Sequence, residues 1–330
     1  MGFGKAAKRQ DGEMKKSLAM LVLLTLIFGG CSTPPAERAD APGEEQAADR
    51  EAAGDDGSEV GEDNESDTDE AADPNEKKPA RRADLDPERT AARLTRIHEA
   101  FRTQLSEWQA NGSQRGAGGW GDLQLLGLEQ QVTMRRLARH PEFADKVIPL
   151  LEGRLRFQAT SNVKAAQGLL KLTTPVKPPI PDYPITRAEL PHKLKKYYDI
   201  AEERFDVPWY ILASVNFIET KFGRFQGPSS AGAEGPMQFL PATWDAYGRG
   251  DVHEPYNAIM GAARYLKASG APDRMRDALY AYNHSDAYVT AILAYAREMK
   301  RSDLNLYDYY FWQVFIRTTK GYKQITGPEL

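Results

Sequence analysis

Residues 207–244 read VPWYILASVNFIETKFGRFQGPSSAGAEGPMQFLPATW. The first part of this stretch predicts a helix, because Asp206 is a suitable N-cap and Pro208 suits a first helical turn. Four side chains then recur at helical spacing, which places them on one face. They are Leu212, Val215, Glu219 and Phe222.

Glu219 is the exception on this otherwise apolar face. A charged group that faces a core is costly unless it is paired or protonated. An apolar setting raises the pKa of a carboxyl group, because it disfavours the anion. A carboxyl that keeps its proton near neutral pH can act as a general acid. The glycine- and serine-rich residues 223–235 follow, which suits a loop that lines a groove.

The formal net charge of −4 is unevenly distributed over the 330 residues. Residues 32–78 contain seventeen acidic and four basic residues. A segment of this composition, with almost no large apolar side chains, is expected to be a disordered tether. We assign this acidic linker to residues 32–85. No basic stripe interleaved with aromatic residues occurs in the sequence, so nucleic acid is not expected as a partner.

Residues 1–31 have the pattern of a signal peptide. Lys15 and Lys16 precede the apolar run at 18–28, whose eleven residues are fewer than the ~20 that a membrane-spanning helix needs. The following FGGC resembles a bacterial lipobox, in which Cys31 is acylated. An ordinary secretory signal with an incidental cysteine is the alternative. Met14 resembles a natural start, which would make the residues before it an extension.

Cys31 is the single cysteine, which excludes an intrachain disulfide and a cysteine metal cluster. If Cys31 is acylated, it anchors the chain to a membrane, and the tether lets the folded part reach away from it. The residue after it is Ser32 and not an aspartate. We therefore expect an exported lipoprotein of the bacterial cell envelope, located at the outer membrane where two membranes exist.

Residues 86–172 are predicted to form a helical module of unknown role. Asp86 and Pro87 have the pattern of a capped helix start, and further helices are expected at about 123–139, 141–157 and 161–172. The proline-rich residues 173–186 are predicted to be a linker and a domain boundary. Residues 187–330 then form the C-terminal domain.

The sequence resembles the lytic transglycosylases with a lysozyme-like, SLT-type catalytic domain. Three separated motifs in residues 190–300 carry this resemblance: IETKFGRFQGPSSAGAEGPMQFLPATW, DVHEPYNAIMGAARYL and ALYAYNHSDAYVTAIL. The chain departs from the family pattern at three places. It has Glu219-Thr220 instead of Glu-Ser, Pro236 instead of Leu, and His284-Ser285 instead of Ala-Gly after the Tyr-Asn pair.

The resemblance implies a mainly α fold with a lysozyme-like C-terminal domain, preceded by the helical module and the acidic tether. It also implies cleavage of the β-1,4 bond between N-acetylmuramic acid and N-acetylglucosamine in peptidoglycan glycan strands. The muramoyl C6 hydroxyl attacks C1 and closes a 1,6-anhydro ring. A single carboxyl, Glu219, would act as acid and then as base. Ordinary glycosidases use two carboxyl groups.

The resemblance further implies a set of substrate-binding residues. Tyr282 is expected to hydrogen-bond Glu219, and Gln238 has an amide suited to sugars. Three of the residues have a local role as the alternative. The Ser229 hydroxyl can bond the backbone of its own loop, Met237 can pack in the core, and Asn283 can cap a helix. The complete set is Ser229, Met237, Gln238, Tyr282 and Asn283.

Two other functions are compatible with the sequence. A goose-type lysozyme-like hydrolase on the same fold needs a second acidic group to activate water. Glu234 and Asp245 are the candidates, and both are expected to be solvated. A catalytically silent peptidoglycan-binding lipoprotein is the other alternative, although the presence of Glu219 argues against it. No cofactor and no metal site are expected.

The C-terminal residues 306–322, LYDYYFWQVFIRTTKGY, are dense in aromatic side chains. Such rings can form the wall of a sugar-binding groove. We expect instead that this segment closes the hydrophobic core.

Overall fold

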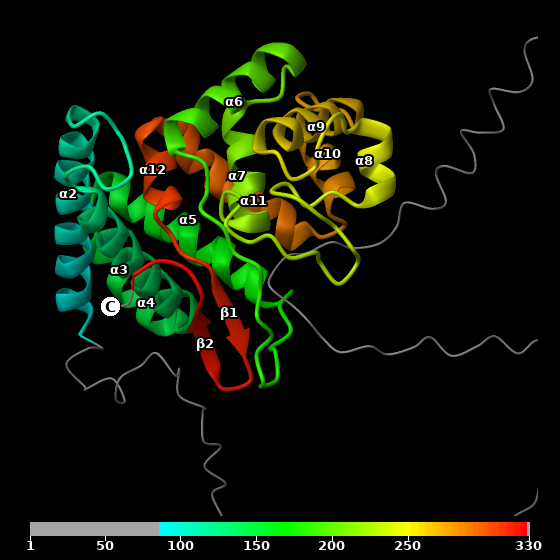
Figure 1. Ribbon diagram of the computed structural model, residues 1–330. Helices are drawn as coiled ribbons and strands as arrows, with labels where there is room; N and C mark the ends of the chain where they lie inside the picture. The colour runs from blue at the N-terminus through cyan, green and yellow to red at the C-terminus, as the bar shows by residue number, and fades with distance from the viewer. Residues whose placement is uncertain (1–85, 329–330) are drawn as a thin grey trace, which may run out of the picture. The chain divides into compact units, whose positions relative to one another are not determined.

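The computed structural model describes residues 86–328 (Figure 1). Cys31, the predicted signal peptide and almost all of the predicted tether therefore lie outside the described residues. The fold is mainly α-helical, as predicted. Within residues 86–328, no helix is long and apolar enough to cross a membrane. The elements are α2 (Pro87–Ala110), α3 (Trp120–Arg139), α4 (Pro141–Val147), η2 (Ile148–Leu150), α5 (Gly153–Leu170), α6 (Pro191–Phe205), α7 (Trp209–Thr220), α8 (Pro241–Tyr247), α9 (Pro255–Ala268), α10 (Met275–Tyr282), α11 (Asp286–Arg301), α12 (Leu304–Tyr310), β1 (Phe315–Thr318) and β2 (Gly321–Gln324).

The helical module begins as predicted but divides at a different place. The Asp86 carboxylate caps α2 by accepting a hydrogen bond from the Arg89 N–H at 2.9 Å. The expected break between 157 and 161 is wrong, because α5 runs through it. Within α5, the Thr160 hydroxyl donates to the Arg156 carbonyl at 2.8 Å, which satisfies this hydroxyl inside the helix.

The break lies instead at the short 3-10 helix η2 and the residues after it. Leu151 is extended, and Gly153 has a φ of +47°. A left-handed conformation is readily adopted by glycine because it lacks a Cβ. The chain can therefore turn here and start α5 in a new direction.

The junction between α6 and α7 corrects the predicted cap. Asp206 has a φ of +57° and ends α6, with its N–H donating to the Glu202 carbonyl at 2.7 Å. The N-cap of α7 is Pro208, which provides no side-chain hydrogen bond. Glu202 compensates by accepting from the Trp209 N–H at 3.2 Å. Sequence alone did not distinguish the end of one helix from the start of the next.

Helix α11 is the central element of the core, since α5 and α7 both pack against it (Figure 1). Helix α3 packs on both α2 and α5, and α6 packs on α9 and α7. One hydrophobic cluster extends from Leu94 in α2 to Trp312 after α12. Residues on either side of the predicted boundary at 173–186 thus share a core. The division into domains remains a prediction.

The aromatic C-terminal segment closes this core, as predicted. Tyr309, Tyr310 and Phe311 are buried. The centre of the Phe311 ring lies 5.1 Å from the ring centre of Trp120 and 5.8 Å from the ring centre of Phe101. The segment therefore attaches the helical module to the C-terminal helices.

The antiparallel hairpin β1–β2 was not predicted. Phe315 pairs with Gln324 and Thr318 with Gly321. The predicted linker runs beside β1, where the Val176 N–H donates to the Arg317 carbonyl at 2.9 Å. The hairpin also forms part of the wall of a cavity that is lined by Glu219.

Candidate active site

Glu219 lies in the last turn of α7, which is the most deeply buried helix of the site. All ten residues from Ile211 to Thr220 are buried, so α7 is enclosed by the rest of the structure on every side. The predicted burial of Leu212, Val215 and Glu219 is confirmed, with Glu219 only 2 % exposed. Phe222 is also buried but lies beyond the helix, with a φ of +63°.

The two oxygens of the Glu219 carboxyl differ in their hydrogen bonding. Oε1 accepts a hydrogen bond from the Tyr288 hydroxyl at 2.6 Å. Oε2 is buried and has no hydrogen-bond partner among residues 86–328. Burial raises the pKa of Glu219 to about 8, and this effect exceeds the opposing influence of the Tyr288 hydrogen bond and the Lys221 charge. The carboxyl is therefore mostly protonated at neutral pH and can deliver a proton from its unbonded oxygen.

Lys221 follows Glu219 by two residues in a left-handed conformation, with a φ of +52°. Its ammonium donates to the Phe217 carbonyl at 3.0 Å and lies 4.1 Å from the centre of the Phe217 ring. Burial and, to a smaller extent, the charge of Arg135 lower the pKa of Lys221 to about 7, although the Glu219 charge opposes this shift. The proton affinities of Lys221 and Glu219 are thus linked.

The structure assigns the hydrogen bond to Glu219 differently from the sequence prediction. The Tyr282 hydroxyl donates to the Met237 carbonyl at 2.5 Å, so the expected bond from Tyr282 to Glu219 is wrong. Tyr288, six residues later in α11, donates to Glu219 instead. Tyr282 ends α10 and holds the loop that follows α7 in place.

This loop is held close to Glu219 by several local hydrogen bonds. The Thr220 hydroxyl donates to the Pro236 carbonyl at 2.7 Å. Ser229 Oγ accepts from the N–H groups of Ala231 and Ala233 at 3.2 and 3.0 Å. Ser229 therefore has the local role that was its alternative. Its contact with a substrate remains a prediction.

The other predicted binding residues are mostly buried. Gln238 has a φ of +51°, and its Nε2 donates to the Gly235 carbonyl at 3.1 Å. Its Oε1 is buried without a hydrogen-bond partner in the described part of the chain. Met237 and Asn283 have no exposed surface, and Asn283 is the C-cap of α10. Burial at these two positions suits packing and capping better than direct contact with a substrate.

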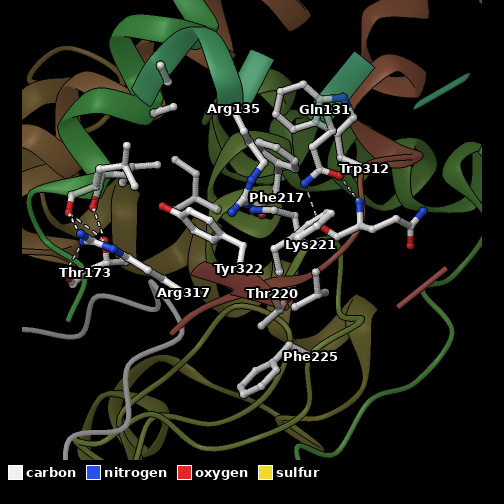
Figure 2. Close-up of a pocket in the computed structure, with 18 of the residues that line it drawn as sticks. Gln131, Arg135, Thr173, Phe217, Thr220, Lys221, Phe225, Trp312, Arg317 and Tyr322 are labelled. Carbon is white, nitrogen blue, oxygen red and sulfur yellow. Dashed lines mark hydrogen bonds between the residues drawn. The ribbon is translucent and has the colours of Figure 1, made fainter. Parts of the chain in front are cut away.

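A cavity of about 160 Å³ has Glu219 among its lining residues. Figure 2 shows this cavity with Arg135, Lys221 and Arg317 labelled. Its walls come from α3, α5, the end of α7, α11, the hairpin and the residues before it. Glu219 is the single acidic residue among its described lining residues. The basic residues that line it are Arg135, Arg139, Lys221 and Arg317.

Most of these lining residues were missed by the sequence reasoning. Arg135 and Arg317 lie outside the motifs that carry the resemblance, and nothing in their spacing marks them. Lys221 lies within the first motif, directly after Glu219-Thr220. Its closeness to Glu219 in the sequence could have indicated that it belongs to the site. The predicted substrate residues Ser229, Gln238 and Tyr282 do not line this cavity. In the described residues, no three His, Cys, Asp or Glu side chains are placed to hold a metal ion.

Residues 196–305, about one third of the chain, match the sequence model of the Transglycosylase SLT domain family. The chain therefore contains an SLT-type domain of the lytic transglycosylases. Its helical architecture agrees with the lysozyme-like fold of such domains. Members of this family are peptidoglycan lytic transglycosylases, so the match supports this class of activity at the level of the family. No solved structure matches the chain.

Proposed function

We propose that this protein cleaves the β-1,4 bond between N-acetylmuramic acid and N-acetylglucosamine and leaves 1,6-anhydro-muramoyl ends. The observation that carries the proposal is a single buried carboxyl, Glu219, beside a cavity whose described lining contains no second acid. A reaction in which the substrate supplies its own nucleophile requires one carboxyl group. Proximity then supplies much of the rate.

Glu219 acts twice in this mechanism. Its Oε2 first gives a proton to the glycosidic oxygen, and the bond between that oxygen and C1 of the muramoyl residue breaks. The resulting carboxylate is stabilised by the hydrogen bond from Tyr288. It then takes the proton of the C6 hydroxyl as that oxygen bonds to C1. The proton lost in the first step is recovered in the second, and no water is consumed.

A hydrolase is disfavoured because no second acidic residue lines the cavity in the described part of the chain. Inverting glycosidases place two carboxyl groups roughly 6.5–9.5 Å apart, with the attacking water between the second carboxylate and the sugar, and retaining glycosidases place them about 5–5.5 Å apart. Glu298 and Asp308, the other fully buried acids of the described structure, do not line the cavity. Glu234 has a side chain that is 49 % exposed and lies 3.9 Å from His253.

The mass of the products tests this proposal directly. Purified peptidoglycan is digested with the full chain, and the soluble muropeptides are weighed. We expect anhydro-muramoyl ends. Products that are heavier by one water would identify a hydrolase. If no fragment is released, the silent peptidoglycan-binding alternative is favoured.

Tyr288→Phe is expected to change both the rate and its pH dependence. The general acid must be protonated, so the wild-type rate should decline as the pH rises through about 8. The Tyr288 hydrogen bond lowers the pKa of Glu219, so its removal should move this decline to higher pH. Loss of one hydrogen bond to a charged group should also reduce kcat by roughly tenfold or more.

The measurement is kcat/KM against pH for the wild type and the variant. Tyr282→Phe is the matched control, because the hydroxyl that it removes bonds to Met237 and not to Glu219. The control should keep the wild-type midpoint. An unchanged midpoint in Tyr288→Phe would show that this hydroxyl does not tune Glu219.

The location of the enzyme is part of the proposal. Anchoring through an acylated Cys31 and a tether over residues 32–85 would present the folded part to the cell wall. These residues lie outside the described structure, so the support is their sequence pattern. Labelling with a radioactive fatty acid should depend on Cys31 and be lost in Cys31→Ala.

A further inference from the structure

The cavity beside Glu219 has an unusual charge balance. Four of its described lining residues are basic and one is acidic, and that acid is mostly protonated at neutral pH. The basic residues come from separate elements: α3, the residue after α7, and β1 (Figure 2). The mechanism proposed above uses none of them.

Arg317 and Arg135 both have neutral groups among their contacts. Arg317 donates from Nη1 to the carbonyls of Leu170 and Thr173 at 3.2 and 3.0 Å. The Arg135 guanidinium lies 4.0 Å from the ring centre of Tyr322 and 4.4 Å from that of Phe315. Carbonyl groups hold the Arg317 guanidinium in place without cancelling its charge.

Lys221 and Arg317 carry the argument most directly. In residues 86–328, neither of them forms an ion pair, and the bonded partner of Lys221 is the neutral Phe217 carbonyl. The pKa of Lys221 is lowered by burial and by the neighbouring charges of Arg135 and Arg224. Cations that are crowded together in a partly buried site destabilise one another, and a bound anion relieves this repulsion.

We propose that this cavity binds a carboxylate carried by the muramoyl residue of the strand being cleaved. The inference rests on the proposed function, which places a muramoyl residue at Glu219. That sugar bears an acidic substituent, whereas N-acetylglucosamine bears none. The carboxylate is either the lactyl group of a bare strand or an acid of the attached peptide. A cavity of about 160 Å³ has room for a small acidic group and a few waters.

Four substrates test the proposal and separate the two sources. They are peptidoglycan with its peptides, strands from which an amidase has removed the peptides, and each of these after carbodiimide amidation of the carboxyl groups. We expect amidation to raise KM by about tenfold, as for one charge-assisted hydrogen bond. A rise only with the peptide-free strands identifies the lactyl group, because its carboxyl is free only after the peptide has been removed. A rise with both kinds of strand shows that the cavity binds either carboxylate. A rise only with peptide-bearing strands identifies the peptide.

Lys221→Met and Arg317→Gln should abolish most of this discrimination. The ratio of KM for amidated and native strands should approach one in both variants. Lys164→Met is the matched control, because Lys164 is an exposed residue of α5 outside the cavity lining. It should keep the wild-type ratio. Circular dichroism checks that each variant is folded, and either pocket variant alone suffices for the test.

Binding to the Glu219→Gln variant separates this inference from the proposed reaction. Isothermal titration calorimetry measures the binding of soluble strands to this variant without turnover. Weaker binding of amidated strands supports the carboxylate site even if the reaction products disprove the transglycosylase mechanism. Equal binding of native and amidated strands, or equal KM values for them in the wild type, would overturn the inference.

Discussion

Glu219→Gln should lower the release of soluble muropeptides by about 10²–10⁴-fold, the usual contribution of a general acid-base group. Glutamine has nearly the same shape and can still accept the hydrogen bond from Tyr288. It cannot give up an acidic proton or take one back. The measurement is initial rate on purified peptidoglycan, followed by separation of the soluble products.

Glu234→Gln is the matched control for this loss. Glu234 lies in the loop after α7, and its side chain is 49 % exposed. Its rate should stay within about twofold of the wild type, since surface changes of this kind have small effects. If Glu219→Gln kept its activity while Glu234→Gln lost it, the acid would have been assigned to the wrong residue.

The same Glu219→Gln change should stabilise the fold at alkaline pH. The pKa of Glu219 is about 8 in the folded chain and 4.5 as its ordinary value. The folded state therefore holds this proton more tightly, and the stability that results is lost as the pH rises from about 4.5 through 8. Glutamine has no proton to lose, so the variant should show a smaller decline.

Urea unfolding at pH 5 and pH 9 measures this difference. The variant should exceed the wild type by a few kcal/mol at pH 9, because one pKa unit corresponds to about 1.4 kcal/mol. The two proteins should be nearly equal at pH 5. Equal stability at both pH values would mean that Glu219 is solvated and is not a buried acid.

The centre of the site was predictable because its signal is local. Glu219 shares a helical face with Leu212 and Val215, and helical periodicity alone places it in the core. Its hydrogen-bond partner was not predictable in this way. Tyr282 and Tyr288 flank a break between α10 and α11. The orientation of α11 after this break decides which hydroxyl reaches Glu219, and that orientation depends on packing against α5 and α7.

The same reasoning explains what was missed in the fold. Asp86 caps α2 through a residue three positions away, so its role is readable in the sequence. The contact of Arg135 with Tyr322 joins α3 to β2 over a long sequence separation. No sequence pattern within α3 or within β2 predicts this contact. The basic cavity is therefore a product of tertiary structure, although each of its elements is locally ordinary.

Arg102→Met should destabilise the chain by about 3–5 kcal/mol at pH 8, the usual result of removing one partner from a buried ion pair. Arg102 of α2 contacts the Asp308 carboxylate of α12 at 2.5 Å. Asp308 is fully buried, and its Oδ2 also accepts from Gln158 at 3.2 Å. Burial raises the pKa of Asp308 to about 6 despite the opposing charge of Arg102, so the group is ionised at pH 8.

The size of this loss should depend on pH with a definite sign. Without Arg102, the folded-state pKa of Asp308 rises further above its wild-type value of about 6, so the stability that only the variant loses builds up as the pH rises from about 6 towards the higher pKa. The variant should therefore lose less stability at pH 5 than at pH 8. The measurement is the free energy of unfolding in urea at both pH values.

Two further variants show whether the unpaired charge of Asp308 causes the loss of stability. Arg102→Met combined with Asp308→Asn removes the charge and should recover most of the lost stability. Arg93→Met is the control on the same helix. Arg93 pairs with Glu129 at 2.6 Å, but its side chain is 50 % exposed, so its loss should cost at most about 1 kcal/mol. A similar cost for Arg93 and Arg102 would show that the contact between α2 and α12 is no stronger than a surface pair. The helical module would then contribute through apolar packing alone.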